Sequence, residues 1–179
     1  NIRKLHGKHL MAYTIEQALQ SDLFEHVVVS TDSTDIAEMA KTYGAEAWFL
    51  RPAELATDEA PKLPVIHHAF LEAEKHYGHE FEILVDLDAT SPLRSVDDIN
   101  GAYDQLITED ADILITASPC RKNPYFNMVE KVNGRVRKVK ELKPPPTRRQ
   151  DAPAVYDMNA FIYIWKRRAL LEYDTLFTE

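Results

Sequence analysis

The hydrophobic positions of this chain alternate between helical and strand patterns. Apolar side chains at helical spacing predict helices at residues 11–21, 36–40, 65–77 and 96–107. Short β-branched or apolar runs predict strands at residues 27–29, 48–50, 83–87 and 113–115. A repeated helix–strand order requires a mainly parallel sheet with right-handed crossovers. The predicted fold class is therefore α/β, a doubly wound, Rossmann-like sandwich.

The strand at residues 83–87 leads into a cluster of polar side chains. Asp86 and Asp88 stand at its carboxyl end, and Pro92 cannot continue a sheet ladder. Ligands of open α/β sheets bind just beyond the carboxyl ends of the strands. With hydroxyl groups and Arg94 close by, this edge indicates a polar, phosphorylated ligand. An ordinary capped turn after a buried strand explains the same residues and remains an alternative.

The regular order breaks at residues 119–157. Asn133 and Gly134 lie between two short strand patterns, and this dipeptide is a strong hairpin signal. A returning strand at residues 161–165 and a helix near Arg167 close the chain. The sequence thus predicts one α/β domain of residues 1–118 and 158–179 with an inserted arm of residues 119–157. Two strands alone are marginally stable, so the arm is interpreted as a dimerisation element, with a plain surface hairpin as the alternative.

Composition narrows the function classes. The 179 residues are 45% hydrophobic and 28% charged, which suits one domain with a real core. No apolar run is long enough for a membrane span, and the net charge of −8 argues against a general nucleic-acid binder. The single cysteine, Cys120, indicates a reducing compartment, so a cytoplasmic location is predicted. Because the sequence starts at Asn1 without a methionine, we expect residues upstream of it.

Familiar site motifs are missing from the sequence. Neither a Walker motif nor a Gly-x-Gly-x-x-Gly loop occurs. His67 and His68 are adjacent and point apart on a helix, and His76 and His79 straddle Gly78, where the helix should end. These pairs make poor metal sites, and the sequence leaves the metal ligands unknown.

Five blocks of residues carry a family resemblance over nearly the whole chain. They are Gly7–Lys8 ahead of a helix, VSTD at 29–32, LRPAELATD at 50–58, TSPLR at 90–94 and RQDAP at 149–153. Together they resemble the acylneuraminate cytidylyltransferases, the CMP-sialic acid synthetases and their relatives. The resemblance implies transfer of CMP from CTP to a nine-carbon keto-sugar acid with release of pyrophosphate and use of Mg2+. It also implies a nucleotide-diphospho-sugar transferase fold and a homodimer whose active site is shared.

The resemblance assigns roles residue by residue. Asn1 matches the end of the family's phosphate-gripping loop, and the family's metal-binding Asp-x-Asp would lie beyond Glu179. From the resemblance we expect Asn1 and Asp88 to be catalytic. The other expected contacts are to the nucleotide by Asn1, Asp58, Ala60 and Lys62, and to the sugar by Asp88, Arg149 from the other subunit, Asp157, Asn159 and Tyr163. Surface ion pairing of Arg149 and core packing of Tyr163 are the structural alternatives.

Two departures bear on the sugar. Sialic acid synthetases carry Gln at the position of Asp88 and Arg at the position of Asp157. An arginine-to-aspartate exchange reverses a charge, so the recognised substituent must differ. The strings around both acids resemble synthetases for legionaminic-type sugars. The alternatives are a non-catalytic, dimeric nucleotide-binding relative and a 3-deoxy-octulosonate cytidylyltransferase, although the latter's Gln-Gly-Asp-Glu-Pro turn is absent from the sequence.

Overall fold

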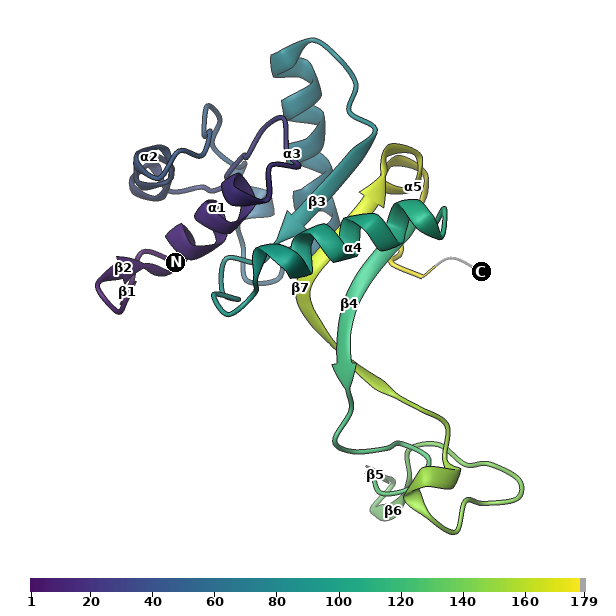
Figure 1. The fold of residues 1–179 in the computed structure, drawn as a ribbon. Helices are drawn as coiled ribbons and strands as arrows, with labels where there is room; N and C mark the ends of the chain where they lie inside the picture. Colours follow the sequence, from purple (N-terminus) through teal and green to yellow (C-terminus); the bar gives the residue numbers. More distant parts are fainter. Residues whose placement is uncertain (178–179) are drawn as a thin grey trace. The chain divides into compact units, whose positions relative to one another are not determined.

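The computed structural model describes residues 1–177, which form two compact units (Figure 1). Of the described residues, the first unit comprises 1–116 and 160–177, and the second comprises Ala117–Asn159. These limits differ by two residues at each boundary from those expected. The elements in chain order are β1 (Lys4–Leu5), β2 (Lys8–His9), α1 (Leu10–Ser21), α2 (Thr34–Thr42), η1 (Ala53–Leu55), α3 (Lys62–Tyr77), β3 (Ile83–Leu87), α4 (Val96–Thr108), β4 (Ile113–Pro119), β5 (Val129–Val132), β6 (Arg135–Lys138), η2 (Arg149–Asp151), β7 (Tyr156–Lys166) and α5 (Arg167–Glu172).

The sheet of the first unit has the strand order β3-β7-β4. The α/β class is confirmed, but β7 runs antiparallel to β3, from the pair Ile83↔Lys166 to the pair Leu87↔Ile162. Strand β7 therefore does not have the parallel direction that we expected. The chain returns to β7 from the inserted unit and not through a helical crossover, so the rule that makes crossovers parallel does not apply to this strand.

Alternate side chains of β7 face two helical layers. Ile162 and Ile164 pack with α4, whereas Tyr163 and Trp165 pack with α3. Strand β3 follows the same period of two, since Ile83, Val85 and Leu87 lie on the α4 side and Leu84 lies on the α3 side. Figure 1 shows α4 lying across one face of this sheet. A strand buried on both faces reads as one apolar run, which is why these strands could be predicted.

The segment at residues 27–29 does not form a ladder strand. Its pairing is one parallel bridge, Val28↔Glu46, in which Glu46 N donates to Val27 O at 2.7 Å and Val29 N donates to Glu46 O at 2.8 Å. Val27 and Val29 pack against Met11 and Ile15 of α1. The strand expected at residues 48–50 is also not formed. Both predictions were wrong because a β-branched or aromatic run forms a ladder only where a neighbouring strand runs beside it.

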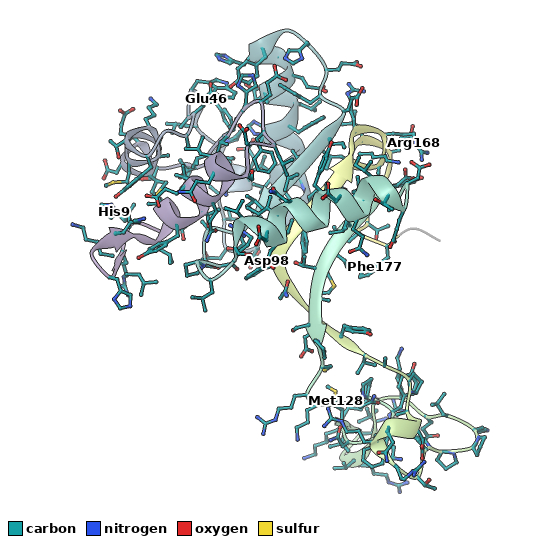
Figure 2. All side chains as sticks on the ribbon, in the orientation of Figure 1. His9, Glu46, Asp98, Met128, Arg168 and Phe177 are labelled. Carbon is teal, nitrogen blue, oxygen red and sulfur yellow. The ribbon has the colours of Figure 1, made fainter. Side chains whose placement is uncertain are left out.

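Local signals set the ends of several elements as predicted. The Ser95 hydroxyl accepts from Asp98 N at 3.1 Å, and the Asp98 carboxylate accepts from Ser95 N at 2.8 Å, which is a complete capping box at the start of α4 (Asp98 is labelled in Figure 2). Gly78 ends α3 with φ of 76°. The β5–β6 turn places Asn133 at φ 51° and Gly134 at φ 78°, the left-handed pair that a tight hairpin requires.

The second unit is built around Asn123 and the β5–β6 hairpin. The Asn123 side chain is 6% exposed, donates to Pro153 O at 2.9 Å and accepts from Tyr125 N at 2.9 Å. Its backbone N–H donates to Asn127 Oδ1 at 2.8 Å. One buried amide thus ties the two connections of the hairpin together. Among the described residues of both units, we find no helix that is long and apolar enough to cross a membrane.

Candidate functional site

A groove of about 960 Å3 runs along β3 in the first unit. It is lined by β3, by residues 23–32 and by parts of α1 and α3. Most of the groove is apolar, lined by side chains such as Val27, Val29 and Val85. Its polar end lies where β3 ends and gathers both charge signs, contributed by Asp32, Arg51, Lys62, Asp86 and Asp88.

Lys62 is the first residue of α3 and pairs with a carboxylate on β3. Its Nζ lies 2.6 Å from Asp86 Oδ2 and 4.4 Å from the centroid of the Tyr163 ring. The side chain of Asp86 is 24% exposed and that of Lys62 is 44% exposed. Because the first backbone N–H groups of a helix have no partner within it, the start of α3 attracts anions as the lysine does. The contact places Lys62 at the polar end of the groove.

Asp88 follows β3 and is fixed by the turn that comes after it. Its Oδ1 accepts from both the backbone N–H and the hydroxyl of Thr90, each at 2.7 Å. Its carbonyl accepts from Thr14 Oγ1 at 3.2 Å and from Ser91 N at 3.2 Å. The residue is half-buried and lines the groove. The carboxylate is therefore held in one orientation before any ligand arrives.

Arg51 is a groove cation that the sequence analysis did not single out as a site residue. Its guanidinium donates to the Ser30 hydroxyl at 3.2 Å and to the Ser30 carbonyl, and its backbone N donates to Thr31 O at 2.8 Å. These bonds hold the loop after residue 29 against the loop that begins at residue 51. Ser30 and Arg51 belong to two of the blocks that resemble the family, at residues 29–32 and 50–58. This was the signal that could have identified them.

Arg94 has a different role from the one its position in the sequence indicates. Its side chain is 2% exposed and donates to Phe161 O at 2.6 Å, to Thr14 Oγ1 at 3.0 Å and to Gln17 Oε1 at 3.3 Å. Burial lowers the pKa of Arg94, while Asp88 and Asp86 oppose that effect. Arg94 joins α1 to β7 from inside the protein, so it is not the ligand-facing cation that we expected.

The remaining expected nucleotide residues lie in part along the groove. Asn1, Ala60, Lys62 and Asp88 all line it, whereas Asp58 is not among its lining residues. The Asn1 carbonyl accepts from Met11 N at 3.1 Å, and Ala60 N donates to Thr57 O at 3.1 Å. The structure thus brings three of the expected nucleotide residues, together with Asp88, to one groove. Their contacts with a nucleotide stay predictions.

The expected sugar residues fall into both units. Tyr163 is 5% exposed and packs with Trp165 at a centroid distance of 5.8 Å in the first unit. In the second unit Arg149 donates to Cys120 O at 3.1 Å, and the Cys120 thiol donates to Asp157 Oδ1 at 3.0 Å. Asn159 is exposed. Sugar contacts by these residues stay predictions.

The polar end suits a polyphosphate and a divalent cation. Arg51, Lys62 and the start of α3 supply positive charge, and Asp86 and Asp88 supply the carboxylate oxygens that Mg2+ prefers. Mg2+ in nucleotide sites is usually held by one or two carboxylates together with phosphate oxygens. The donor set at the end of β3 therefore fits such an ion in company with a nucleotide.

Comparison with known proteins gives consistent matches along the chain. Residues 1–178 match a family model described as cytidylyltransferase. Post-translational flagellin modification protein B of Campylobacter coli is 48% identical over 177 residues, covering 99% of this chain and 74% of that protein. The CMP-N,N'-diacetyllegionaminic acid synthase of Campylobacter jejuni is 52% identical over 177 residues, with the same coverage of 99% and 74%.

A solved structure supports the fold. The CMP:2-keto-3-deoxy-manno-octonic acid synthetase, solved in complex with CTP, superimposes with a TM-score of 0.67 over 99% of this chain and 71% of that one. The two sequences are 16% identical, so this likeness concerns the fold alone.

Proposed function

Because this chain belongs to the cytidylyltransferase family, we propose that it transfers CMP from CTP to a nonulosonic acid of the legionaminic type, releasing pyrophosphate. Family membership confirms the resemblance drawn from the five sequence blocks. It also makes the protein a nucleotidyltransferase. The choice of sugar rests on the 52% identity to the diacetyllegionaminic acid synthase.

The reaction needs charge neutralisation and alignment. The anomeric hydroxyl of the sugar attacks the α-phosphorus of CTP, the new phosphorus–oxygen bond forms, and pyrophosphate leaves with the displaced electron pair. Transfers of this kind depend mainly on positioning and on stabilising charge on the phosphate oxygens. Lys62, Arg51 and the start of α3 are the groups at the groove that can neutralise the triphosphate.

The acids after β3 support two further roles. Asp88 is held by Thr90 and lines the groove, so its free acceptor capacity can orient the sugar or an ion. Mg2+, when bound, would be held by Asp86 or Asp88 and would neutralise phosphate oxygens. Both roles are proposals that follow from residue type and place.

A homodimer with a shared active site is part of the proposal. The hairpin of the second unit exposes Val129 by 63% and Val136 by 69%. In the β5–β6 register Lys131 lies opposite Val136 and two residues from Val129, so both valines share one face. The two exposed valines, which share this face with lysines such as Lys131, suit burial against a second subunit, which Arg149 of the same unit would reach.

The test uses the protein with its complete termini, CTP and Mg2+. Pyrophosphate release is measured with N,N'-diacetyllegionaminic acid, pseudaminic acid, sialic acid and 3-deoxy-octulosonate. We expect the highest kcat/KM with the legionaminic acid. Absence of release with every sugar would leave the non-catalytic, nucleotide-binding alternative, and a preference for the octulosonate would overturn the assignment of the sugar.

A matched pair of lysine variants tests the groove. Lys62→Met should lower kcat/KM for CTP by about 10-fold or more, because it removes a charge-assisted contact with phosphate or base. Lys75→Met changes an exposed lysine near the other end of the same helix, whose side chain is 77% exposed, and should leave the reaction unchanged. Equal activity of both variants would exclude Lys62 from the site.

A cytoplasmic location stays a prediction that rests on the single cysteine.

A further inference from the structure

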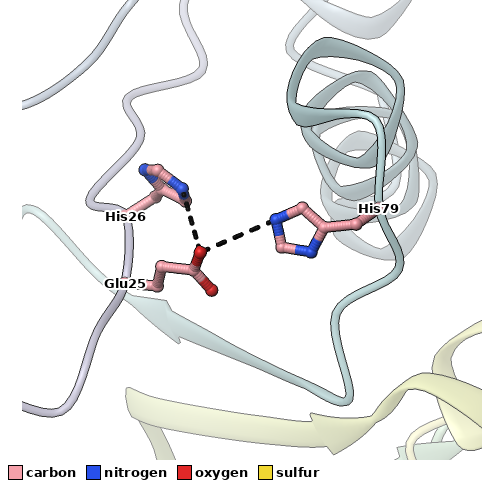
Figure 3. A group of neighbouring side chains, drawn as sticks. All are labelled: Glu25, His26 and His79. Carbon is pink, nitrogen blue, oxygen red and sulfur yellow. Dashed lines mark ion pairs between the residues drawn. The ribbon is translucent and has the colours of Figure 1, made fainter.

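A second group of polar side chains lies where the chain enters β3, at the opposite end of that strand from Asp88. Glu25, His26 and His79 offer one carboxylate oxygen and two imidazole nitrogens, which all lie within 4.8 Å of one another (Figure 3). Glu25 and His26 precede the segment at residues 27–29, and His79 follows the cap of α3. The proposed transfer reaction uses none of these residues.

We propose that Glu25, His26 and His79 bind a Zn2+ ion that ties the end of α3 to the segment before residue 27. Two imidazoles and one carboxylate are a donor set that suits zinc and is too rich in nitrogen for Mg2+ or Ca2+. The pairs His67–His68 and His76–His79, by contrast, consist of histidines that are close in sequence. The cluster combines residues from two separate segments, so spacing along the chain could not reveal it.

The distances allow the ion to enter with small side-chain rotations. Glu25 Oε1 lies 3.7 Å from His26 Nε2 and 3.6 Å from His79 Nε2. Neighbouring ligand atoms of a tetrahedral zinc site are about 3.3 Å apart, given metal–ligand bonds of about 2 Å. The side chains of Glu25 and His79 are 63% and 43% exposed, so solvent can reach the cluster and supply a fourth ligand.

A second carboxylate orients the His26 ring. His26 Nδ1 lies 2.9 Å from Glu46 Oε1, and the Tyr77 hydroxyl donates to Glu46 Oε2 at 2.7 Å. With a hydrogen-bond donor at each of its two oxygens, the Glu46 carboxylate accepts from His26 Nδ1, which leaves His26 Nε2 for the cluster.

This arrangement leaves two ligand atoms facing each other. With Nδ1 directed at Glu46, Nε2 of His26 faces the cluster, where the Glu25 carboxylate is an acceptor. Two such atoms repel unless a cation or a proton lies between them. A carboxylate that orients a histidine through its other nitrogen is the usual support of a metal-binding imidazole.

The supporting residues are already rigid. The His26 ring stacks on Tyr77 with a centroid distance of 3.5 Å, and the His79 ring lies 4.5 Å from that of Phe81. The backbone of Glu46 is held by the bridge to Val28. Preorganised rings lower the entropy that metal binding must overcome.

The test is a Zn2+ titration of the intact protein without CTP or sugar. Calorimetry and competition with a chromophoric chelator measure the affinity and the number of ions bound. We expect one Zn2+ per chain, with at least 10-fold weaker binding in His79→Ala and in Glu25→Gln. Glu46→Gln should weaken binding by about 10-fold, because it removes the group that orients His26. His6→Asn is the matched control, since His6 is exposed and distant in sequence, and asparagine tolerates its φ of 48°.

Co2+ provides a second readout, because its visible absorption reports tetrahedral coordination by nitrogen and oxygen. The spectrum should appear in the wild type and in His6→Asn and should be lost in His79→Ala. Unchanged Zn2+ affinity in both His79→Ala and Glu25→Gln, or no binding at equimolar metal, would overturn the proposal. The cluster would then be a solvated group of side chains that binds no metal.

Discussion

At the scale of single residues, burial separates the roles of the two cations nearest the end of β3. Lys62 keeps 44% of its side chain exposed and lines the groove, whereas Arg94 is 2% exposed and donates to three protein oxygens. A ligand can reach the first cation and cannot reach the second. Arg94, the arginine of the TSPLR block, therefore stabilises the fold and affects the site only indirectly.

Replacing Arg94 should therefore cost stability. We predict that Arg94→Met lowers the free energy of unfolding by about 2–4 kcal/mol, because the Phe161 carbonyl and the Gln17 side chain lose a buried donor. Urea denaturation followed by circular dichroism measures the change. Arg168→Met, which alters an arginine with a side chain that is 58% exposed, should leave the midpoint unchanged. Loss of CTP affinity at unaltered stability would instead make Arg94 a ligand contact.

Asp88 and Asp157 are predicted to set the choice of sugar. Both are acceptors, so the site should favour a sugar that presents N–H donors from acylated amines over one that presents hydroxyls. The measurement is kcat/KM for sialic acid and for a 5,7-diamido nonulosonic acid in the wild type, Asp88→Gln and Asp157→Arg. We expect the ratio to move toward sialic acid by about 10²-fold. If both variants keep the wild-type ratio, neither acid reads the sugar.

At the scale of elements, a carboxylate of α3 joins that helix to α5. Glu74 accepts from Arg167 Nε at 2.8 Å and Nη2 at 3.2 Å, and also from Phe81 N at 3.1 Å. The Glu74 side chain is 11% exposed. Hydrogen bonds from Arg167, and then from Phe81, hold the pKa of Glu74 below its ordinary value of 4.5, although burial opposes this.

The sign of this pKa change predicts a pH-dependent loss in Glu74→Gln. A carboxyl group with a lowered folded-state pKa stabilises the protein above its unfolded-state pKa, and the contribution disappears as pH falls through the folded-state value. Glu74→Gln should therefore lower Tm by about 2–6 °C at neutral pH, and the difference should close as the pH falls below 4.5 and through the lowered folded-state pKa. Thermal unfolding at several pH values measures it. The control is Glu38→Gln, which changes a side chain that is 72% exposed and should leave Tm equal to that of the wild type. A Tm difference for Glu74→Gln that stays constant with pH would contradict the ion-pair explanation.

At the scale of the whole molecule, the second unit is predicted to complete a neighbouring subunit. Lys140 N donates to Pro124 O at 3.0 Å, so residues 125–139 form a closed loop that a short Gly-Ser link can replace. We predict that this deletion gives a monomer without transferase activity. Light scattering coupled to gel filtration and pyrophosphate release measure the two outcomes, and a fully active monomer would exclude a shared site.

A gentler variant separates dimerisation from folding. Val129→Lys with Val136→Lys replaces the two exposed valines of one hairpin face by charges, whereas Glu130→Gln changes the opposite face of the same hairpin. The double variant should dissociate the dimer at micromolar concentration, and Glu130→Gln should leave it intact. Dissociation of both, or of neither, would argue against this face as the contact.

Several features of the protein were determined by short stretches of sequence. The Ser95–Asp98 capping box, the Asn133–Gly134 turn and the Gly78 helix end all formed as the local pattern indicated. The apolar runs at β3 and β7 also predicted buried strands. These signals depend on backbone preferences and side-chain periods within a few residues, so they can be read without knowing the fold. The family blocks likewise identified the transferase.

The tertiary structure decided what depends on distant segments. The direction of β7, the failure of residues 27–29 to form a ladder, the burial of Arg94 and the joining of Glu25, His26 and His79 all depend on which segments lie side by side. Strand pairing and burial depend on contacts between segments that are far apart in the sequence. The same type of residue can stand in a buried or in an exposed environment. Sequence therefore determined most of the helices, the buried strands β3 and β7 and the family, and packing assigned each side chain to the groove, the core or the cluster.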